Sequence, residues 1–555
     1  MLSCFTHNRA CRMKQKERHE RIRNLPEECH SPLTDNELHI IAQQSSSIVA
    51  DVQAGRLEPR EVLVAYGKKA IKAQRETNCL TEIMIAEAEE WAKSCNKTGP
   101  LAGMPVSLKD MVCVAGFDST AGYSVWAGNP ATKNSPLFEL LLDAGAIPFV
   151  KTNVPITLLA YEAFNDVWGR TTNPHSSAYS PGGSSGGEAA LLAFGGSRLG
   201  IGTDVAGSVR VPSHYSGVYT IKASSTRFPK AGNVTSTIGQ EGVPSAYSPM
   251  TRTLGDLETF WGAVMSMKPW EYDPSCSPIP WRAVQLPKKC RIGVMWNDGV
   301  VAPSPACLRA LNEVVDALRD DGHEIFTIDP PSPFEALKIG SQLMANACIG
   351  ATSRLRWGES NDPGIASGLR AFHFPRLLTS LYAWFTRTIL GDPLYASLIS
   401  SWRPQTPQEF YHRIADREAY RMRWHEFWKD QKDEDGREMD FVLTVPNAMP
   451  AMPHGDSKNQ WTSCGYAFLF NILDYSAGVL PVTHVDRADD VLPSAFKPRN
   501  AVEAGAYKTY NSDAMHGLPV GVQVVGRRLE EEKVLEGMKL VEGLLRARGT
   551  AYELL

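Results

Sequence analysis

Two stretches that are dense in glycine and serine dominate this sequence: Ser180–Ala189, which reads SPGGSSGGEA, and Gly202–Val211, which reads GTDVAGSVRV. Glycine tolerates positive φ angles and lets the backbone approach a ligand closely. Such loops can therefore present adjacent backbone N–H groups to one negatively charged oxygen atom. A plain connecting loop is the alternative interpretation of either stretch taken alone.

Two common motifs of similar composition do not fit these stretches. The phosphate-binding pattern GxxxxGK[ST] is absent, because Glu188 stands after the glycines where a lysine is required. The GxSxG pattern of the α/β-hydrolases is met formally by Gly182–Gly186, but that motif needs a strand directly before it. The preceding segment Asn173–Pro181 is polar and broken, so we treat this match as accidental.

Upstream of the two loops, short apolar runs alternate with a helical pattern. Met104–Leu108 and Ile147–Val150 are expected to be strands. Between them, Ser135 is a typical N-cap, Pro136 fits the first helical position, and Gly145 follows the expected end of the helix. This alternation is typical of an α/β core.

The same alternation resumes in the C-terminal half of the chain. Strands are expected at Arg291–Trp296, Glu324–Ile328, Phe441–Val445 and Leu518–Val525, with helices around residues 308–318 and 534–545. The simplest assembly is an α/β fold in which helices wrap both faces of one large, mixed, twisted sheet.

Residues 34–555 are predicted to form a single domain. Thr34 and Glu37 have the spacing of a capping box, and Pro59 opens a second amphipathic pattern, so two helices are expected before the core. Residues 1–33 are predicted to be a poorly ordered N-terminal extension. Their charged run lacks the apolar core of a secretory signal.

Residues 330–440 are predicted to form a helical lobe inserted into this domain. The pattern there is rich in aromatic residues and contains no recognisable strand signal. Within the lobe, Phe374–Leu398 alternates aromatic residues and leucines with Arg376 and Arg387. We expect this segment to pack on the core as a lid, and contact with a membrane surface is the alternative.

The overall composition narrows the class of protein. The chain has 555 residues and a net charge of −4, so it lacks the basic field that attracts phosphate backbones, and no nucleic-acid partner is expected. Its 11 cysteines include no CxxC pair that would suggest zinc, and neither a metal nor an organic cofactor is expected. The cysteine content favours a reducing, cytoplasmic compartment. No stretch is apolar for the ~18 to 20 residues of a membrane span.

Taken together, three motifs resemble the amidase signature family: PGGSSGGE, the pattern GTD-x-x-GS-x-R, and an upstream strand that ends in Lys109 and Asp110. Their spacing also agrees, because Lys109 lies 75 residues before Ser184, and Ser208 lies 24 residues after Ser184. Within the family, the sequence is most similar to fungal acetamidase-like members and to fatty acid amide hydrolase.

The resemblance extends from about Thr34 to the C-terminus, through segments such as KTNVP (Lys151–Pro155) and LDYSAGVLPV (Leu473–Val482). It implies that residues 34–555 are an amidase catalytic domain and that residues 330–440 form its lobe over the active site.

The resemblance also implies a role for each matching residue. Ser208 is the expected nucleophile, Ser184 the bridging serine and Lys109 the terminal base, while Thr203 supports the proton relay. The backbone N–H groups of the turn at the nucleophile are expected to form the oxyanion hole: Val205, Ala206, Gly207 and Ser208. A cis peptide bond is expected between Gly183 and Ser184.

These roles make chemical sense. A serine hydroxyl is a poor nucleophile until a neighbour accepts its proton, and lysine can accept one only when burial lowers its pKa well below ~10.4. The apolar residues that flank Lys109 would favour the neutral amine. Ser184 would relay the proton from Ser208 toward Lys109, and the same pair would return it to the leaving nitrogen.

The expected wall of the acyl pocket is apolar. Thr157 and Leu158 are the predicted substrate-binding residues there, followed by Leu159 and Tyr161, and they suggest an uncharged acyl group. One departure from the family pattern is Ala206, which stands where glycine is usual and would be strained if this position needed a positive φ.

Two neighbouring features have plain structural interpretations. Asp204 and Arg210 are expected to form a structural ion pair rather than a catalytic one. Cys113 is expected to be a small core residue rather than a nucleophile.

The predicted function is hydrolysis of the C–N bond of a small, or an aliphatic or aromatic, carboxamide to a carboxylate and ammonia or an amine, through an acyl-enzyme, and the sequence leaves the acyl chain length open. A glutaminase subunit of an amidotransferase that needs a partner protein is one alternative. A non-catalytic protein that retains the fold is the other. The expected partner is a small-molecule amide, and the sequence leaves open both a homodimer and a monomer.

Overall fold

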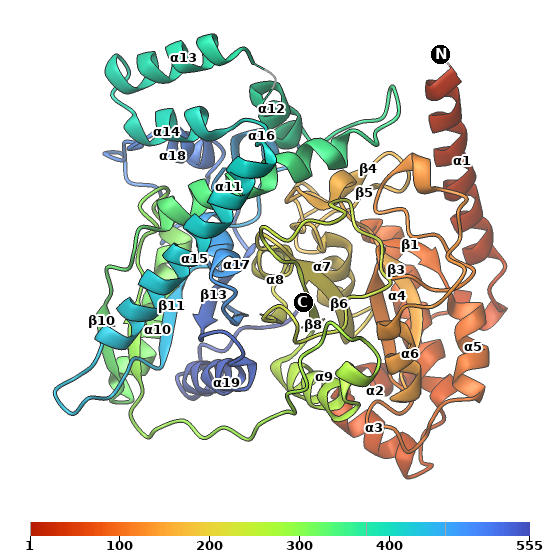
Figure 1. The fold of residues 1–555 in the computed structure, drawn as a ribbon. Helices are drawn as coiled ribbons and strands as arrows, with labels where there is room; N and C mark the ends of the chain where they lie inside the picture. The colour runs from red at the N-terminus through yellow and green to blue at the C-terminus, as the bar shows by residue number, and fades with distance from the viewer. Residues whose placement is uncertain (1, 373, 461) are drawn as a thin grey trace.

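A mixed sheet of eleven strands runs through the whole molecule (Figure 1). The computed structural model describes residues 2–372, 374–460 and 462–555. In spatial order the strands are β1 (Leu80–Ile83), β3 (Ile147–Thr152), β2 (Pro105–Lys109), β6 (Leu199–Asp204), β8 (Ala246–Thr251), β7 (Tyr219–Lys222), β12 (Ala477–His484), β13 (Pro519–Val525), β11 (Phe441–Thr444), β9 (Arg291–Val294) and β10 (Glu324–Thr327). A separate hairpin pairs β4 (Phe164–Asn165) with β5 (Gly169–Arg170).

The sheet is parallel around β2 and antiparallel through its middle. β2 pairs in parallel with both β3 and β6, whereas β6, β8, β7, β12 and β13 pair antiparallel in turn. The predicted α/β fold with a large mixed sheet is confirmed. Because β2 and β6 are parallel neighbours, their carboxyl ends meet at the same edge of the sheet.

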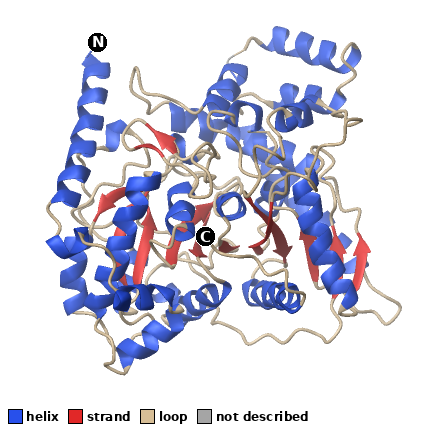
Figure 2. Ribbon diagram, turned by 180° about the vertical axis from the view of Figure 1, so that it is seen from behind, coloured by secondary structure: helices blue, strands red, loops and turns tan. Residues whose placement is uncertain are grey.

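Helices cover both faces of this sheet (Figure 2). The helices of the main body are α4 (Pro59–Thr77), α5 (Ile85–Lys93), α6 (Pro136–Asp143), α7 (Gly186–Ala193), α8 (Arg210–Ser216), α9 (Leu254–Ser266), α10 (Pro305–Asp320), α16 (Ser457–Gln460), α17 (Gly465–Ile472), α18 (Ala501–Tyr507) and α19 (Glu531–Ala547). Short 3₁₀ turns are η1 (Glu27–His30), η2 (Ser124–Trp126), η3 (Ile156–Leu158) and η4 (Pro269–Glu271). As predicted, Ser135 caps α6 by accepting a hydrogen bond from the N–H of Phe138.

Every strand that the sequence predicted is present in the sheet, but five further strands were missed: β1, β6, β7, β8 and β12. β6 was missed because Gly200 and Gly202 made it resemble a loop. A Cβ atom on Gly200 would lie 1.9 Å from the carboxylate of Glu188. Glycine at this position therefore serves the close packing of α7 on the sheet.

The N-terminal region contains more helices than the two that the sequence predicted. The first predicted helix is split into α2 (Asp35–Ala42) and α3 (Ser45–Gln53), because Gln43 and Gln44 are extended. The N–H of Ser45 donates to Asp256, which anchors the start of α3 to α9. The capping box of Thr34 and Glu37 is present as predicted.

Residues 2–23 form helix α1 (Leu2–Arg23), which contacts β1 along the right-hand side of Figure 1. The sequence predicted poor order for this extension, whereas the structure gives it a packed helix with one buried cation. The Nζ of Lys14 lies 2.8 Å from Glu82, 2.7 Å from Glu17 and 3.1 Å from Asp118.

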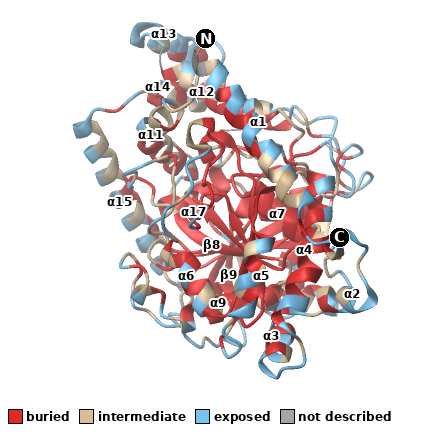
Figure 3. Cartoon of the chain, turned by 90° about the vertical axis from the view of Figure 1, so that its right-hand side faces the viewer, coloured by how far each residue is buried: buried red, intermediate tan, exposed pale blue. Residues whose placement is uncertain are grey.

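The region of the predicted lobe contains α11 (Pro333–Thr352), α12 (Pro363–Phe372), α13 (Arg376–Thr388), α14 (Pro393–Ser401) and α15 (Pro407–Asp430). In Figure 3, α13 stands at the edge of the molecule and is coloured as exposed along much of its length. The division of the chain into an extension, a catalytic domain and a lobe stays a prediction. Of the helices in the described residues, none is both long and apolar enough to span a bilayer.

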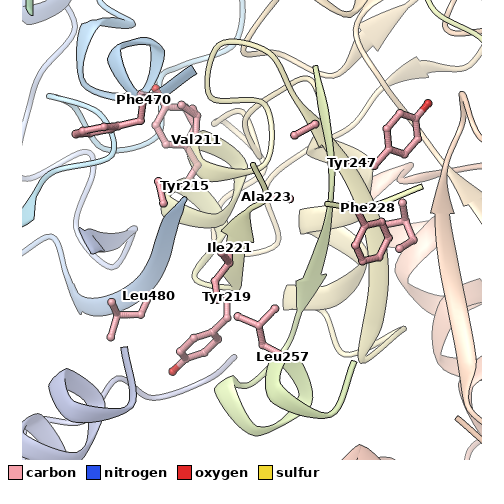
Figure 4. Close-up of a cluster of buried hydrophobic side chains, with 14 of the residues drawn as sticks. Val211, Tyr215, Tyr219, Ile221, Ala223, Phe228, Tyr247, Leu257, Phe470 and Leu480 are labelled. Atoms are coloured by element: carbon pink, nitrogen blue, oxygen red, sulfur yellow. The ribbon is translucent and has the colours of Figure 1, made fainter. Parts of the chain in front are cut away.

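The hydrophobic core reaches the turn that carries Ser208. All seven residues of α8, the helix after this turn, are buried. Val211 and Tyr215 of α8 share a buried cluster with Ile221 of β7 and Leu480 of β12 (Figure 4). The core therefore holds the turn rigidly from its C-terminal side.

We expect Lys14→Ala to destabilise the protein by about 3 to 5 kcal/mol, because it leaves the buried carboxylates of Glu82 and Asp118 without their nearest cation. Urea unfolding followed by circular dichroism measures the change. The matched control is Lys16→Ala, since the Lys16 side chain is 75% exposed and should leave the midpoint unchanged. Equal midpoints for both variants would contradict the role of Lys14.

Candidate active site

Lys109 is the last residue of β2 and lies in the protein interior with no exposed surface. Its Nζ donates to Ser184 Oγ over 2.8 Å and to Thr203 Oγ1 over 2.7 Å. Thr203 belongs to β6, the parallel neighbour of β2, and Ser184 lies in the loop that leads into α7. The structure thus brings together the lysine, the first serine and the supporting threonine that the sequence singled out.

The surroundings of Lys109 disfavour its ammonium form. Burial lowers the pKa of Lys109 to about 7, although the negative charges of Asp204 and Glu188 oppose the shift. Near neutral pH a large fraction of the side chain is therefore the neutral amine, which is the form that can accept a proton.

Glu188 is a neighbour of this site whose place the sequence reasoning missed. It is fully buried and accepts hydrogen bonds from the hydroxyls of Ser107 and Thr152, the latter over 2.7 Å. Burial raises the pKa of Glu188 above its ordinary value. The signal in the sequence is an acidic residue directly after the glycines, in the first turn of a helix.

Ser208 lies in the turn between β6 and α8, and a buried ion pair holds that turn. Arg210 Nη2 lies 3.0 Å from Asp204 Oδ1, and both side chains are fully buried. Asp204 also accepts from the N–H groups of Gly207 and Val209, over 2.8 and 3.2 Å. Although burial alone would raise the pKa of Asp204, the guanidinium of Arg210 holds it well below its ordinary range. The predicted ion pair is present and holds the backbone of the turn.

The predicted oxyanion hole differs from the structure at one position. The N–H of Gly207 is engaged by Asp204, so it is not free for a ligand. Among the described residues, the backbone N–H groups of Val205, Ala206 and Ser208 donate to no acceptor. These three groups are the remaining donors of the turn.

Ala206 is not strained, although glycine is usual at this position in the family. The positive φ of this turn falls on Gly207, at 106°, and Ala206 does not share it. The hydroxyl of Tyr161 donates to the carbonyl oxygen of Ala206 over 3.0 Å and steadies the turn. The departure from the family pattern therefore leaves the backbone conformation intact.

The two serine-bearing loops are joined directly. The N–H of Ser185 donates to the carbonyl oxygen of Ser208 over 3.1 Å, so the segments of the two predicted functional serines lie against each other. The peptide bond between Gly183 and Ser184 is cis, as the resemblance implied. A Cβ atom on Gly183 would lie 2.2 Å from the carbonyl oxygen of Ala160, so only glycine fits there.

A small cavity of about 70 Å³ opens beside Ser208. Its lining comes from several parts of the chain: Leu158, Leu159, Ala160, Tyr161, Val205, Ala206, Ser208, Asp362, Ser457 and Cys464. Leu158 lies on this wall as predicted. Thr157 does not line the cavity, because it is fully buried and its carbonyl accepts from the hydroxyl of Ser236.

The wall around Leu158 has an unusual backbone. Thr157 and Leu158 have φ angles of 67° and 63°, and such conformations cost non-glycine residues on the order of 1 to 3 kcal/mol each. The hydrogen bond from Ser236 is one of the contacts that hold this strained segment in place. Strain of this kind is often found where a ligand-binding wall needs a fixed shape.

Cys113 is a buried residue, as predicted, and it does not line this cavity. Within the described residues, no group of three or more His, Cys, Asp or Glu side chains is arranged to hold a metal ion.

The chain is similar to known amidases over most of its length. A family model described as "Amidase" matches residues 61–535. An acetamidase of Aspergillus oryzae is 32% identical over 94% of this chain and 93% of its own length. Fatty-acid amide hydrolase 1 of Sus scrofa is 34% identical over 93% of this chain and 88% of its own.

The solved structures give the same result for the fold. A fatty acid amide hydrolase superposes with a TM-score of 0.80 at 28% identity, over 92% of this chain and 87% of that one. The resemblance that the sequence motifs carried is thereby confirmed. A family match over most of the chain, together with near-full-length relatives, means that this protein belongs to the amidase family.

Proposed function

We propose that this protein hydrolyses a small carboxamide through a serine acyl-enzyme, with Ser208 as nucleophile, Ser184 as proton relay and Lys109 as terminal base. The observation that carries the proposal is the buried Lys109 amine, 2.8 Å from Ser184 Oγ and with its pKa lowered to about 7. An amine in this state can accept a proton without help from water or a metal.

In the first half-reaction, Ser208 Oγ attacks the carbonyl carbon of the amide while its proton passes to Ser184, and that of Ser184 passes to Lys109. The developing oxyanion accepts hydrogen bonds from the free N–H groups of Val205, Ala206 and Ser208. One such donor contributes ~3 to 4 kcal/mol in well-studied hydrolases.

The C–N bond breaks when the protons return along the same path to the leaving nitrogen. This step is required because an unprotonated amine leaves poorly. Water then attacks the ester of Ser208 with the same relay as its base, and the carboxylate is released.

The size of the cavity supports a short acyl group. The cavity beside Ser208 has a volume of about 70 Å³, which favours a small acyl group over a long chain. The A. oryzae relative carries the name acetamidase, which agrees with a short acyl chain. An acetamide-like carboxamide is therefore the substrate class that we propose.

The alternatives weighed from the sequence are less well supported. A glutaminase subunit would require a partner for activity, whereas the two relatives named above match nearly their whole length to this one chain. A non-catalytic role does not explain why a lysine is buried against a serine at an energetic cost. Cytoplasmic localisation, the absence of cofactors and the oligomeric state stay predictions.

The exposed side of α13 supports the membrane contact that the sequence left as an alternative. Leu377 is 81% exposed, and Leu381, Trp384 and Ile389 are more than half exposed. Residues 370–391 contain three arginines and no acidic residue. Apolar, aromatic and basic side chains in one helical segment are typical of an element that lies on an anionic lipid surface.

We expect Ser208→Ala to lower kcat for acetamide by at least ~10³-fold without altering the melting temperature, because the nucleophile is lost while the fold is kept. Ammonia release measures the activity. Cys113→Ala is the control, since this thiol should contribute nothing, and full activity of Ser208→Ala would reject the assigned nucleophile.

The pH dependence tests Lys109. We expect kcat/KM to rise as pH increases through about 7, since the neutral amine is the active form. Lys109→Met should lose activity at every pH and unfold at an equal or higher temperature near pH 7. The unfolded chain binds more protons than the folded one between about pH 7 and the ordinary lysine pKa, so the native lysine lowers stability most at low pH.

Those two readouts are independent. A pH profile that stays flat between pH 6 and 9, or a Lys109→Met variant that keeps its activity, contradicts the role of Lys109 as base.

Vesicle pelleting tests the membrane contact. We expect wild type to sediment with vesicles that contain phosphatidylserine, and the variant Leu377→Asp/Leu381→Asp to stay in the supernatant, because both side chains are exposed. Full recovery of wild type in the supernatant ends the proposal. Self-association of wild type without vesicles, abolished by the same variant, assigns this face to a homodimer instead.

A further inference from the structure

A buried carboxylate from the lobe reaches the same cavity as the nucleophile. Asp362 lies directly before α12, is 5% exposed and lines the cavity of about 70 Å³ beside Ser208. Ser457, the first residue of α16, lines it as well. The sequence predicted an apolar acyl pocket, and Asp362 is an acidic exception to that expectation.

The carboxylate is held in a defined position. Asp362 Oδ1 accepts hydrogen bonds from the N–H groups of Gly364 and Ile365, over 2.8 and 3.1 Å, and so caps the start of α12. The N–H of Gly364 also donates to Ser457 Oγ over 3.3 Å. Both backbone bonds use Oδ1, so Oδ2 can meet a ligand beside the Ser457 hydroxyl, which itself hydrogen-bonds the carboxylate.

The charge of Asp362 has no cation beside it in the cavity. The lining residues include no lysine, arginine or histidine. Burial raises the pKa of Asp362 above its ordinary value, although hydrogen bonds from Ser457 and from the N–H groups of Ile365 and Gly364 oppose the rise, and the nearby charge of Glu162 adds to it. Glu162 itself is paired with Arg170 over 2.8 Å and contacts His454 Nδ1 over 2.7 Å, so neither of these side chains is available to Asp362.

A buried acid without a cationic neighbour is stabilised by a ligand that supplies one. The cavity is small, so this group has to stand within a few atoms of the scissile carbonyl. The apolar side chains of Leu158 and Leu159 on the same wall exclude water from the contact, which strengthens a charge-assisted hydrogen bond.

We infer that Asp362 determines specificity, and that it selects short amides whose acyl group carries an ammonium group, such as the amide of a small amino acid. This inference rests on the proposed amide hydrolysis and names its substrate class. The reaction is unchanged, since the amide C–N bond breaks, a Ser208 ester forms, water hydrolyses it, and the ammonium group of the acyl part stays intact.

Glycinamide and propionamide form a matched pair of probes, because they differ only in an ammonium group in place of a methyl group. At about pH 7 most glycinamide is cationic, since an α-amino group has a pKa of ~7.7 to 8.0. We expect Asp362→Asn to lower the ratio of kcat/KM for glycinamide to that for propionamide by at least ~10-fold, mainly through KM. Asparagine is also a good N-cap, so α12 should keep its start.

Asp392→Asn is the matched control. Asp392 caps α14 in the same lobe by accepting from the N–H of Tyr395 over 2.8 Å, but it does not line the cavity. This variant should leave the ratio unchanged. An unchanged ratio in Asp362→Asn, including a case in which both amides lose activity equally, shows a purely structural cap and overturns the inference.

Calorimetric binding separates this inference from the proposed function. On a Ser208→Ala background, glycinamide should bind more tightly than propionamide, and adding Asp362→Asn should remove the difference. Binding that depends on Asp362, together with a wild type that turns over neither amide, rejects the hydrolysis and keeps the pocket assignment. Turnover of propionamide with no preference for glycinamide in either assay rejects the pocket assignment alone.

Discussion

The burial of one amine is the constraint on which the rest of this structure depends. Lys109 is fully buried, so the edge of the sheet around it has to supply two hydroxyl partners for its amine in place of water. Parallel pairing of β2 with β6 brings Thr203 to that amine, and the glycine-rich loop brings Ser184. The low pKa of Lys109 is a direct consequence of this burial, and it leaves much of the amine neutral near pH 7.

Asp204 and Glu188 show how neighbouring charges and hydrogen-bond donors set the protonation state of a buried carboxyl group. Asp204 is paired with Arg210 and accepts backbone hydrogen bonds, so it stays ionised and shapes the turn of Ser208. Glu188 has only hydroxyl donors, and its pKa rises. A carboxyl group therefore anchors the turn in one place and is a buried group with a raised pKa near Lys109 in the other.

The sequence predicted the elements whose signals are local. Capping residues identified α2 and α6, and apolar runs identified six strands of the sheet. It failed where tertiary contacts override local preference. Gly200 lies inside a strand, and it is glycine because the carboxylate of Glu188 leaves no room for a side chain there. In the turn that carries Ser208, the positive φ falls on Gly207 rather than on Ala206, and only the folded structure shows this.

By itself, then, the sequence determined the family and the α/β class and predicted the lysine and the two serines of the proposed site, because motif spacing and periodicity are properties of the linear chain. The tertiary structure alone decided which groups face the cavity. Thr157 turned away from it and the Gly207 N–H was engaged by Asp204. Asp362 entered it from the lobe. The physical reason is that the lining of the cavity is assembled from segments far apart in the sequence, around residues 158–161, 205–208, 362 and 457, and no local pattern encodes which side chains then meet.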